Sequence, residues 1–439
     1  MKLHYCFLFF ATLAVSRYIY PSEDDFYDEP HNLQDYRAGE VIRSREIDKN
    51  SSYHEDLESL DKRFQVLYRT TDSHGDPIAS VTTLLIPTDA RLDRLVSVQD
   101  HIDSASLNCS TSFKLDSGSS IASPVENMMK RGWPVALPDY FSVKAAFGAN
   151  MLSGHAILDS IRALKSGNFS VARNATACLW GFDSASSATA FAAELQPSYA
   201  PELVLEGVVL GDLVVNITQS VIGWNGNVSS PLILPIILGL AKEFPVIQKK
   251  VIDQAKPESE YPIKGSERLC SDYLDEEFSS TDVLNGWKDG QQIFSDPEVS
   301  AVLNNLTCAQ RRIRPPVILY ACSKCNFNLH QMEQLDQAFH DYCNNGSSVE
   351  YVKVMDADFQ IESAFRRSAV AESMKEEPFI WIEERFNNTS TKKQCTSTTT
   401  YLQSYNSPTA TAASSTSNIA PTIAPKNALA IGAIALFIY

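Results

Sequence analysis

Positive charge is scarce in this sequence. Its 37 lysines and arginines stand against 53 aspartates and glutamates, which gives a formal net charge of −16, and the basic residues form no cluster. Nucleic-acid binding needs such a cluster to neutralise phosphates, so no nucleic-acid partner is expected. With 439 residues, 44% of them hydrophobic, the chain can bury a large core as one domain or as a domain with a cap.

The apolar run near the start of the sequence is too short to span a membrane. It covers residues 5–15, follows Lys2 and ends in the small-x-small sequence Ala14-Val15-Ser16. This combination predicts a secretory signal peptide at residues 1–16. A buried N-terminal strand is the alternative interpretation.

Two further patterns fit a secreted protein. Removing Cys6 with the signal peptide leaves eight cysteines, an even number compatible with disulfides formed in an oxidising compartment. Ten Asn-x-Ser/Thr sequons predict N-glycosylation, and they start at Asn50, Asn108, Asn168, Asn174, Asn216, Asn227, Asn305, Asn345, Asn387 and Asn388.

Charge is absent from residues 396–418, which are rich in serine and threonine. This composition predicts an O-glycosylated stalk. Small residues at 415–418, a spacer and the wholly apolar residues 428–439 together resemble a signal for glycosylphosphatidylinositol (GPI) attachment, which we assign to residues 419–439. The alternative is a short helix buried against the fold.

Apolar strand-like segments alternate with helix-like segments through the middle of the chain. Strands are expected at residues 63–70, 79–87, 133–139, 178–182, 203–210 and 316–320. This alternation predicts an α/β fold with a mostly parallel sheet. Residues 212–310 change character, with a strongly apolar helical stretch at 232–244, and are expected to form an inserted helical cap. An ordinary helical layer of the same domain is the alternative.

The strand expected at residues 178–182 leads into a run of small residues that predicts a tightly packed helix. Gly181 and Ala185 flank Asp183 as small-x-Asp-x-small. This is the steric pattern of a nucleophile elbow, in which serine is the usual central residue.

Several segments of the chain carry a family resemblance: Asp24-Asp25-Phe26-Tyr27, Ile42-Arg43-Ser44-Arg45, Asp103-Ser104-Ala105, Pro138-Asp139-Tyr140, Ser153-Gly154-His155-Ala156 and Ala193-Glu194-Leu195-Gln196-Pro197. Through these residues the chain resembles the fungal secretory lipases, the family of the Candida lipases and of lipase A of Candida antarctica. The resemblance covers about residues 20–395. It implies an α/β-hydrolase fold with a helical cap, a serine–histidine–aspartate triad and activity on carboxylic esters.

The resemblance also places the three triad positions in this sequence. The serine position is Asp183, the aspartate position is Cys325 and the histidine position is Phe359, and no histidine follows His340. All three catalytic roles are therefore expected to be lost. The oxyanion hole, at Asp103 and on the side of Ser184, is expected to remain, and it could still bind a carbonyl or carboxylate group.

The resemblance further implies disulfides between Cys109 and Cys270 and between Cys343 and Cys395. The pairing of the other four cysteines stays open. Cys322 and Cys325 form a C-x-x-C motif, which invites a redox or metal-binding interpretation. Structural disulfides or buried thiols are the preferred interpretation, and neither a metal nor a cofactor is predicted.

Three functions remain open on this sequence. The first is a monomeric, inactive lipase homologue (a pseudoenzyme) that binds an acyl chain or another lipid. The second is a lipase-like or esterase-like hydrolase in which Asp183 acts with a base from elsewhere, such as His101. The third is a structural glycoprotein of the cell wall. In each case we expect a secreted protein, held at the cell wall or membrane by a GPI anchor.

Overall fold

The computed structural model describes residues 19–48, 59–116, 123–322, 331–355, 376–389 and 395–401. The proposed signal peptide, most of the stalk and the proposed GPI signal lie outside these residues. In the described ranges no helix is long and apolar enough to cross a membrane.

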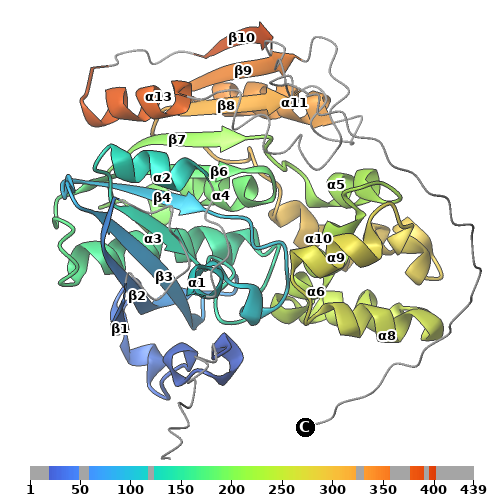
Figure 1. The fold of residues 1–439 in the computed structure, drawn as a ribbon. Helices are drawn as coiled ribbons and strands as arrows, with labels where there is room; N and C mark the ends of the chain where they lie inside the picture. The colour runs from blue at the N-terminus through green and yellow to red at the C-terminus, as the bar shows by residue number, and fades with distance from the viewer. Residues whose placement is uncertain are drawn as a thin grey trace, which may run out of the picture. The chain divides into compact units, whose positions relative to one another are not determined.

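A ten-stranded sheet forms the centre of the described chain, in the order β1-β2-β3-β5-β4-β6-β7-β8-β9-β10 (Figure 1). Its strands β1, β2, β3 and β5 pair antiparallel, and the strands from β5 to β10 pair parallel. The strands are β1 (Val41–Ile47), β2 (Leu60–Thr71), β3 (Pro77–Pro87), β4 (Arg94–Gln99), β5 (Val135–Pro138), β6 (Thr176–Phe182), β7 (Leu205–Gly211), β8 (Val317–Cys322), β9 (Val349–Met355) and β10 (Thr396–Tyr401).

Helices cover both faces of the sheet, and two apolar cores result. One core joins the sheet to α3, α4 and α11, and the other joins it to α1, α2 and α13. Successive residues of β6 alternate between them, since Leu179 belongs to the first core while Cys178 and Trp180 belong to the second. These helices are α1 (Thr111–Asp116), α2 (Ser123–Lys130), α3 (Asn150–Ser166), α4 (Ser186–Tyr199), α11 (Gln331–Asn344) and α13 (Glu377–Phe386). The predicted α/β-hydrolase arrangement is confirmed.

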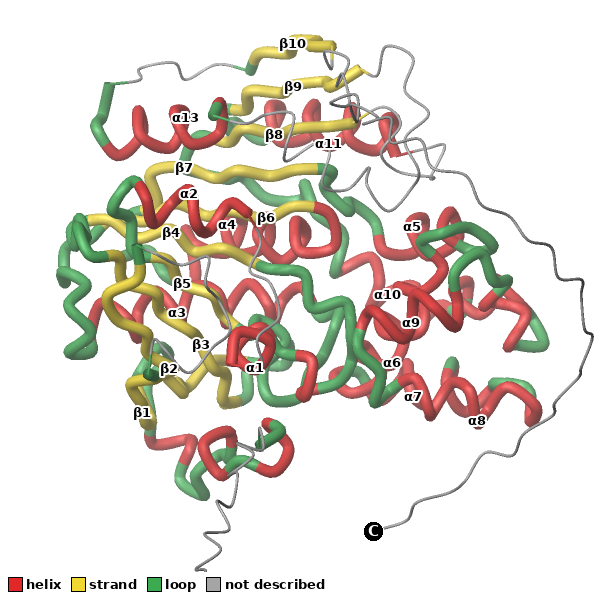
Figure 2. The backbone as a smooth tube through the Cα atoms, viewed as in Figure 1, coloured by secondary structure: helices red, strands yellow, loops and turns green. Residues whose placement is uncertain are grey.

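The chain between β7 and β8 is helical, and its helices gather on one side of the molecule (Figure 2). That is the side toward which the arrows of β4 and β7 point in Figure 1. The helices are α5 (Ile217–Trp224), α6 (Ile233–Glu243), α7 (Pro245–Lys250), α8 (Pro257–Ser266), α9 (Ser271–Phe278) and α10 (Pro297–Asn305).

Close packing fixes α6 on the main body of the domain. A Cβ atom added to Gly239 would lie 2.3 Å from the backbone nitrogen of Phe147, so only glycine allows this approach. Lys144 of the main body forms an ion pair with Glu243 at the end of α6, at 3.1 Å. We call residues 212–310 the cap below.

The start of the serine- and threonine-rich stretch differs from the prediction. Its first six residues, Thr396–Tyr401, form β10, which pairs parallel with β9 at the edge of the sheet. The stalk prediction is therefore wrong for these residues. Threonine is β-branched and suits a strand, and the neighbouring edge of β9 offers hydrogen-bonding groups that composition alone does not reveal.

Candidate functional site at the carboxyl ends of the strands

A sharp turn joins β6 to α4 and carries Asp183. The turn is the 3-10 segment Asp183–Ala185, and Asp183 itself has a φ angle of 51°. A residue other than glycine rarely adopts this left-handed conformation, and it marks the strained strand-to-helix turn of a nucleophile elbow. Asp183 is buried, with only 7% of its surface exposed. The elbow predicted from the sequence is thus present, with a carboxylate at its apex.

Gly181 and Thr189 show why the residues around the elbow are small. A Cβ atom on Gly181 would lie 1.9 Å from the Thr189 Oγ1 atom. That hydroxyl lies 3.0 Å from the Ala185 carbonyl oxygen and 2.9 Å from Gln99 Oε1, and its single proton is shared between these two acceptors. Helix α4 therefore lies directly against β6, as the run of small residues predicts.

A second carboxylate, Asp212, lies beside the elbow. Phe182 at the end of β6 is in register with Gly211 at the end of β7, so Asp183 and Asp212 are the next residues of two neighbouring parallel strands. Asp212 also has a left-handed backbone, with a φ angle of 45°. Its Oδ1 atom accepts a hydrogen bond of 2.8 Å from the Cys322 backbone nitrogen at the end of β8.

The environment of Asp212 favours its protonated form. Desolvation by burial raises the pKa of Asp212 to about 7, the hydrogen bond from Cys322 lowers this pKa, and the nearby Asp183 carboxylate raises it. Asp212 is therefore partly protonated at neutral pH. Sequence analysis missed this residue, although its position directly after an apolar strand was a signal that could have identified it.

Asp103 and Ser184, the residues predicted for the oxyanion hole, are both buried. Asp103 is 8% exposed and has a φ angle of 47°, and Ser184 is 6% exposed. In the described part of the chain, neither Oδ1 of Asp103 nor Oγ of Ser184 has a hydrogen-bond partner. A buried polar group without a partner costs about 1–3 kcal/mol of stability, so these two atoms are suited to bonding a ligand.

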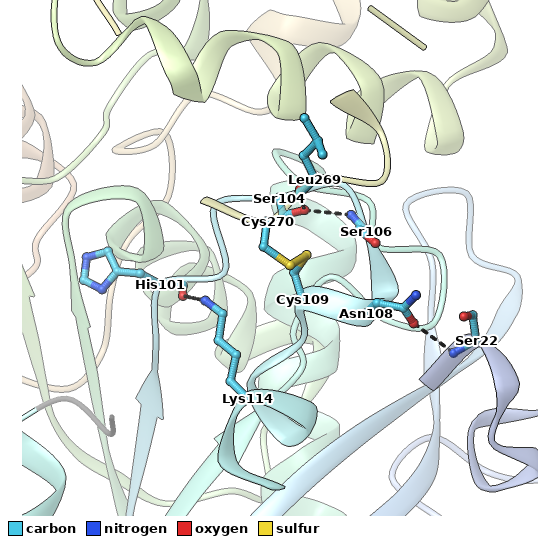
Figure 3. The surroundings of a disulfide bond; sticks show 9 residues. All are labelled: Ser22, His101, Ser104, Ser106, Asn108, Cys109, Lys114, Leu269 and Cys270. Atoms are coloured by element: carbon cyan, nitrogen blue, oxygen red, sulfur yellow. Dashed lines mark hydrogen bonds between the residues drawn. A yellow bond between two sulfur atoms is a disulfide. The ribbon is translucent and has the colours of Figure 1, made fainter. Parts of the chain in front are cut away.

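The loop that carries Asp103 is attached to the cap at three points. Ser104 Oγ donates to the Leu269 carbonyl at 2.7 Å, and the Cys109–Cys270 disulfide lies next to this bond (Figure 3). The third attachment comes from α6, where Lys242 Nζ donates to the Ala105 carbonyl at 2.6 Å.

The contacts of His101 are with Asp100 and Lys114. Its Nδ1 atom lies 4.0 Å from Asp100 Oδ1. Its carbonyl accepts a bond of 2.8 Å from Lys114 (Figure 3). Three other histidines make contacts elsewhere: His74 bonds Glu243, His155 bonds Thr71 and stacks on Tyr199, and His340 contacts Phe339.

The predicted acid and histidine positions, Cys325 and Phe359, lie outside the described residues. Cys322, the other member of the C-x-x-C motif, ends β8 and is disulfide-bonded. No group of three or more metal-ligating side chains occurs among the residues that the structure describes.

The remaining cysteines divide into disulfides and buried thiols. The two pairs implied by the family resemblance are present, Cys109–Cys270 and Cys343–Cys395. Cys178 and Cys308 are free and buried, and burial raises the pKa of both thiols. A thiol with a raised pKa forms little thiolate, so neither is suited to nucleophilic chemistry.

Sequence comparison identifies the family to which the chain is similar. Residues 121–394 match the family model described as secretory lipase. Lipase A of Arthroderma benhamiae is 30% identical over 411 residues, which cover 90% of this chain and 86% of that protein. The trichothecene C-3 esterase of Fusarium sporotrichioides is 30% identical over 359 residues, which cover 78% of this chain and 80% of that protein.

Among solved structures, Candida antarctica lipase A in its closed state has a TM-score of 0.75 to this chain. The two are 22% identical, and the match covers 86% of this chain and 89% of that one. This likeness shows that the two chains share a fold.

Proposed function

Because the chain belongs to the secretory lipase family, we propose that it is a secreted member that binds a neutral acyl lipid without hydrolysing it. The observation that carries this proposal is Asp183 at the apex of the elbow. A serine lipase needs a hydroxyl at this position, together with an imidazole that takes its proton.

A carboxylate at the elbow is a poor replacement for that serine. Attack of the Asp183 carboxylate on an ester would form an anhydride, and a base must then activate water to free the enzyme. Loss of a complete triad leaves a rate about 10³–10⁴-fold above water in well-studied hydrolases, against roughly 10⁶–10¹⁷-fold for complete enzymes. On the proposed register, Cys325 and Phe359 stand at the other two catalytic positions, and neither side chain can do the work of the residue it replaces.

The charge at the strand ends supports a neutral ligand. Asp183 and Asp212 are two neighbouring buried carboxyl groups, so the carboxylate of a fatty acid would meet charge of its own sign. An ester or alcohol group meets no such repulsion. The partner-free Oγ of Ser184 could donate to its oxygen atom.

Asp212 supports a second candidate function. Its pKa of about 7 lets it hold or release a proton at neutral pH beside Asp183. Two carboxyl groups that share a proton activate water in the aspartic proteases. On this alternative the chain is a hydrolase in which Asp183 and Asp212 act together. In this candidate Asp212, rather than His101, is the partner of Asp183.

Hydrolysis assays distinguish the two candidates. The purified mature protein is tested on short-chain and long-chain p-nitrophenyl esters, beside Asp183→Ala, Asp212→Asn and the control Asp61→Ala, which changes an exposed residue of β2. We expect the same background rate from all four proteins. The non-hydrolytic proposal is overturned if the protein turns over an ester, Asp183→Ala abolishes this turnover and Asp61→Ala preserves it. An equal loss of turnover in Asp212→Asn would establish the carboxyl pair as the catalyst.

Binding is measured separately with a fluorescent monoacylglycerol ether and the matching fatty acid. We expect saturable binding of the ether, and weaker binding of the acid above pH 7. Failure to bind either ligand favours the structural cell-wall function.

The proposal for location is a GPI-anchored glycoprotein at the cell surface. It is supported by the composition of residues 402–439 and by secretory family membership. Release of the protein from intact cells by a phosphatidylinositol-specific phospholipase C tests the anchor. Protein found only in the culture medium contradicts it.

A further inference from the structure

The asparagines of the ten sequons differ in what their side-chain amides do in the folded chain. N-glycosylation joins the C1 atom of a sugar to the Nδ2 atom of asparagine. The C1–O bond to the diphosphate of a lipid-linked oligosaccharide donor breaks, Nδ2 loses one proton, and the lipid diphosphate leaves. A glycan that the folded protein carries needs Nδ2 to face solvent, with room for the sugar.

Of the nine sequon asparagines that the structure describes, four meet this requirement fully. Each is exposed, and no hydrogen bond involves its side-chain amide. They are Asn168, Asn174, Asn305 and Asn388.

Four others use Nδ2 in a hydrogen bond inside the fold. Asn345 donates to the Ala309 carbonyl at 3.4 Å and Asn387 to Glu383 Oε1 at 3.1 Å, and both residues are exposed.

The other two are Asn216 and Asn227. Asn227 Nδ2 donates to the Gly223 carbonyl at 2.8 Å, and its Oδ1 accepts from the Ser229 backbone at 2.9 Å. Asn216 Oδ1 caps α5 by accepting from the Gln219 backbone at 3.0 Å, and its Nδ2 donates to Thr307 Oγ1 at 3.4 Å. Both residues are half-buried. A sugar on either nitrogen would disturb these contacts.

Three of the free asparagines share one edge of the sheet. Asn168 and Asn174 lie on the segment that leads into β6, and this segment bonds to the start of β4 through Ala172 to Leu92 at 2.9 Å. Arg94, the first residue of β4, donates to the Oδ1 atom of Asn387, the neighbour of Asn388, at 2.9 Å. Parallel strands begin at this edge, whereas Asp183 and Asp212 follow the strand ends at the opposite edge.

We propose that N-linked glycans occupy Asn168, Asn174 and Asn388 at the edge where the strands begin, together with Asn305 at the end of α10, and that Asn216 and Asn227 stay unmodified. Asn216 lies four residues after Asp212 in the sequence. The edge where the strands end, beside Asp183, thus carries no glycan at Asn216. Three of the four proposed glycans lie at the opposite edge, where the strands begin.

Site occupancy tests this assignment directly. The full-length secreted chain is produced in a eukaryotic host, treated with peptide-N-glycosidase F in H₂¹⁸O and examined by peptide mass spectrometry. We expect ¹⁸O-labelled aspartate at Asn168, Asn174, Asn305 and Asn388, and unchanged asparagine at Asn216 and Asn227. A glycan at Asn216 or Asn227, or one of the four proposed sites bare in most molecules, overturns the proposal.

Paired variants give an independent check. Asn174→Gln should increase electrophoretic mobility by the loss of one glycan while leaving the melting temperature nearly unchanged. Asn227→Gln should leave mobility unchanged and lower the melting temperature, because it disturbs the contacts with Gly223 and Ser229. If Asn227→Gln does not fold, the mass spectrum of the unmutated chain still decides the question. The assignment is also overturned if Asn174→Gln leaves electrophoretic mobility unchanged while Asn227→Gln increases it.

Discussion

Asp183 and Asp212 continue two neighbouring parallel strands, and both adopt a left-handed backbone at the strand end. Two buried carboxyl groups are thereby held close enough for the charge of one to raise the pKa of the other. The relationship makes the stability of the fold depend on pH in a specific way.

The first prediction concerns Asp212. Its pKa is about 7 in the folded chain and near 3.8 when unfolded, so folding binds a proton between these values. The contribution of Asp212 to the free energy of unfolding is complete below about pH 4 and is lost as the pH rises toward 7. At about 1.36 kcal/mol per pKa unit, the loss amounts to at most about 4 kcal/mol. Asp212→Asn keeps the acceptor for Cys322 and removes this loss. Urea unfolding should show similar stability for both proteins near pH 4, and a more stable variant at pH 8. Equal stability at both pH values contradicts the prediction.

The second prediction concerns the coupling of the two carboxyl groups. Asp183→Asn removes the charge and retains a residue type that tolerates the left-handed backbone. The pKa of Asp212 should therefore fall, but only partly, because desolvation is the larger cause of its elevation. NMR titration of ¹³C-labelled carboxyl groups measures this shift. An unchanged Asp212 titration would show that the two side chains do not interact.

The third prediction tests the packing of the elbow. Gly181→Ala places a methyl group 1.9 Å from Thr189 Oγ1, and overpacking of this kind costs about 1–3 kcal/mol. Gly265→Ala in α8 is the matched control, since a Cβ atom there has no atom within 4 Å and alanine favours a helix. Thermal unfolding should show a clear loss of stability for the first variant and none for the second.

The fourth prediction compares the two disulfides. Cys109–Cys270 joins residues 161 positions apart and attaches the Asp103 loop to the cap, whereas Cys343–Cys395 spans 52 positions. Loop-closure entropy makes the first bond the more stabilising, within the roughly 2–5 kcal/mol typical of native disulfides. Unfolding of the two double-serine variants by urea measures both contributions. A larger loss on removing Cys343–Cys395 contradicts this ranking.

The amino-acid sequence alone determined the class of fold and the family. Alternating apolar strands and helices produce a parallel sheet whichever loops connect them. The family motifs around Asp24, Asp103 and Glu194 each lie within a few consecutive residues, so they can be recognised in the sequence. The sequence also showed the elbow, because Gly181, Asp183 and Ala185 lie within five residues. The antiparallel strand β1 and the edge strand β10 were not predicted, since each depends on pairing with a strand elsewhere in the chain.

Only the tertiary structure decided what surrounds the elbow. Strand register brings Asp212 beside Asp183 from 29 positions away, and burial then raises the pKa of Asp212. The same holds for the sequons, which look alike in sequence until folding engages the amides of Asn216 and Asn227 and leaves that of Asn174 exposed. Proximity, burial and hydrogen bonding arise between distant segments, so residue patterns along the chain could not reveal them.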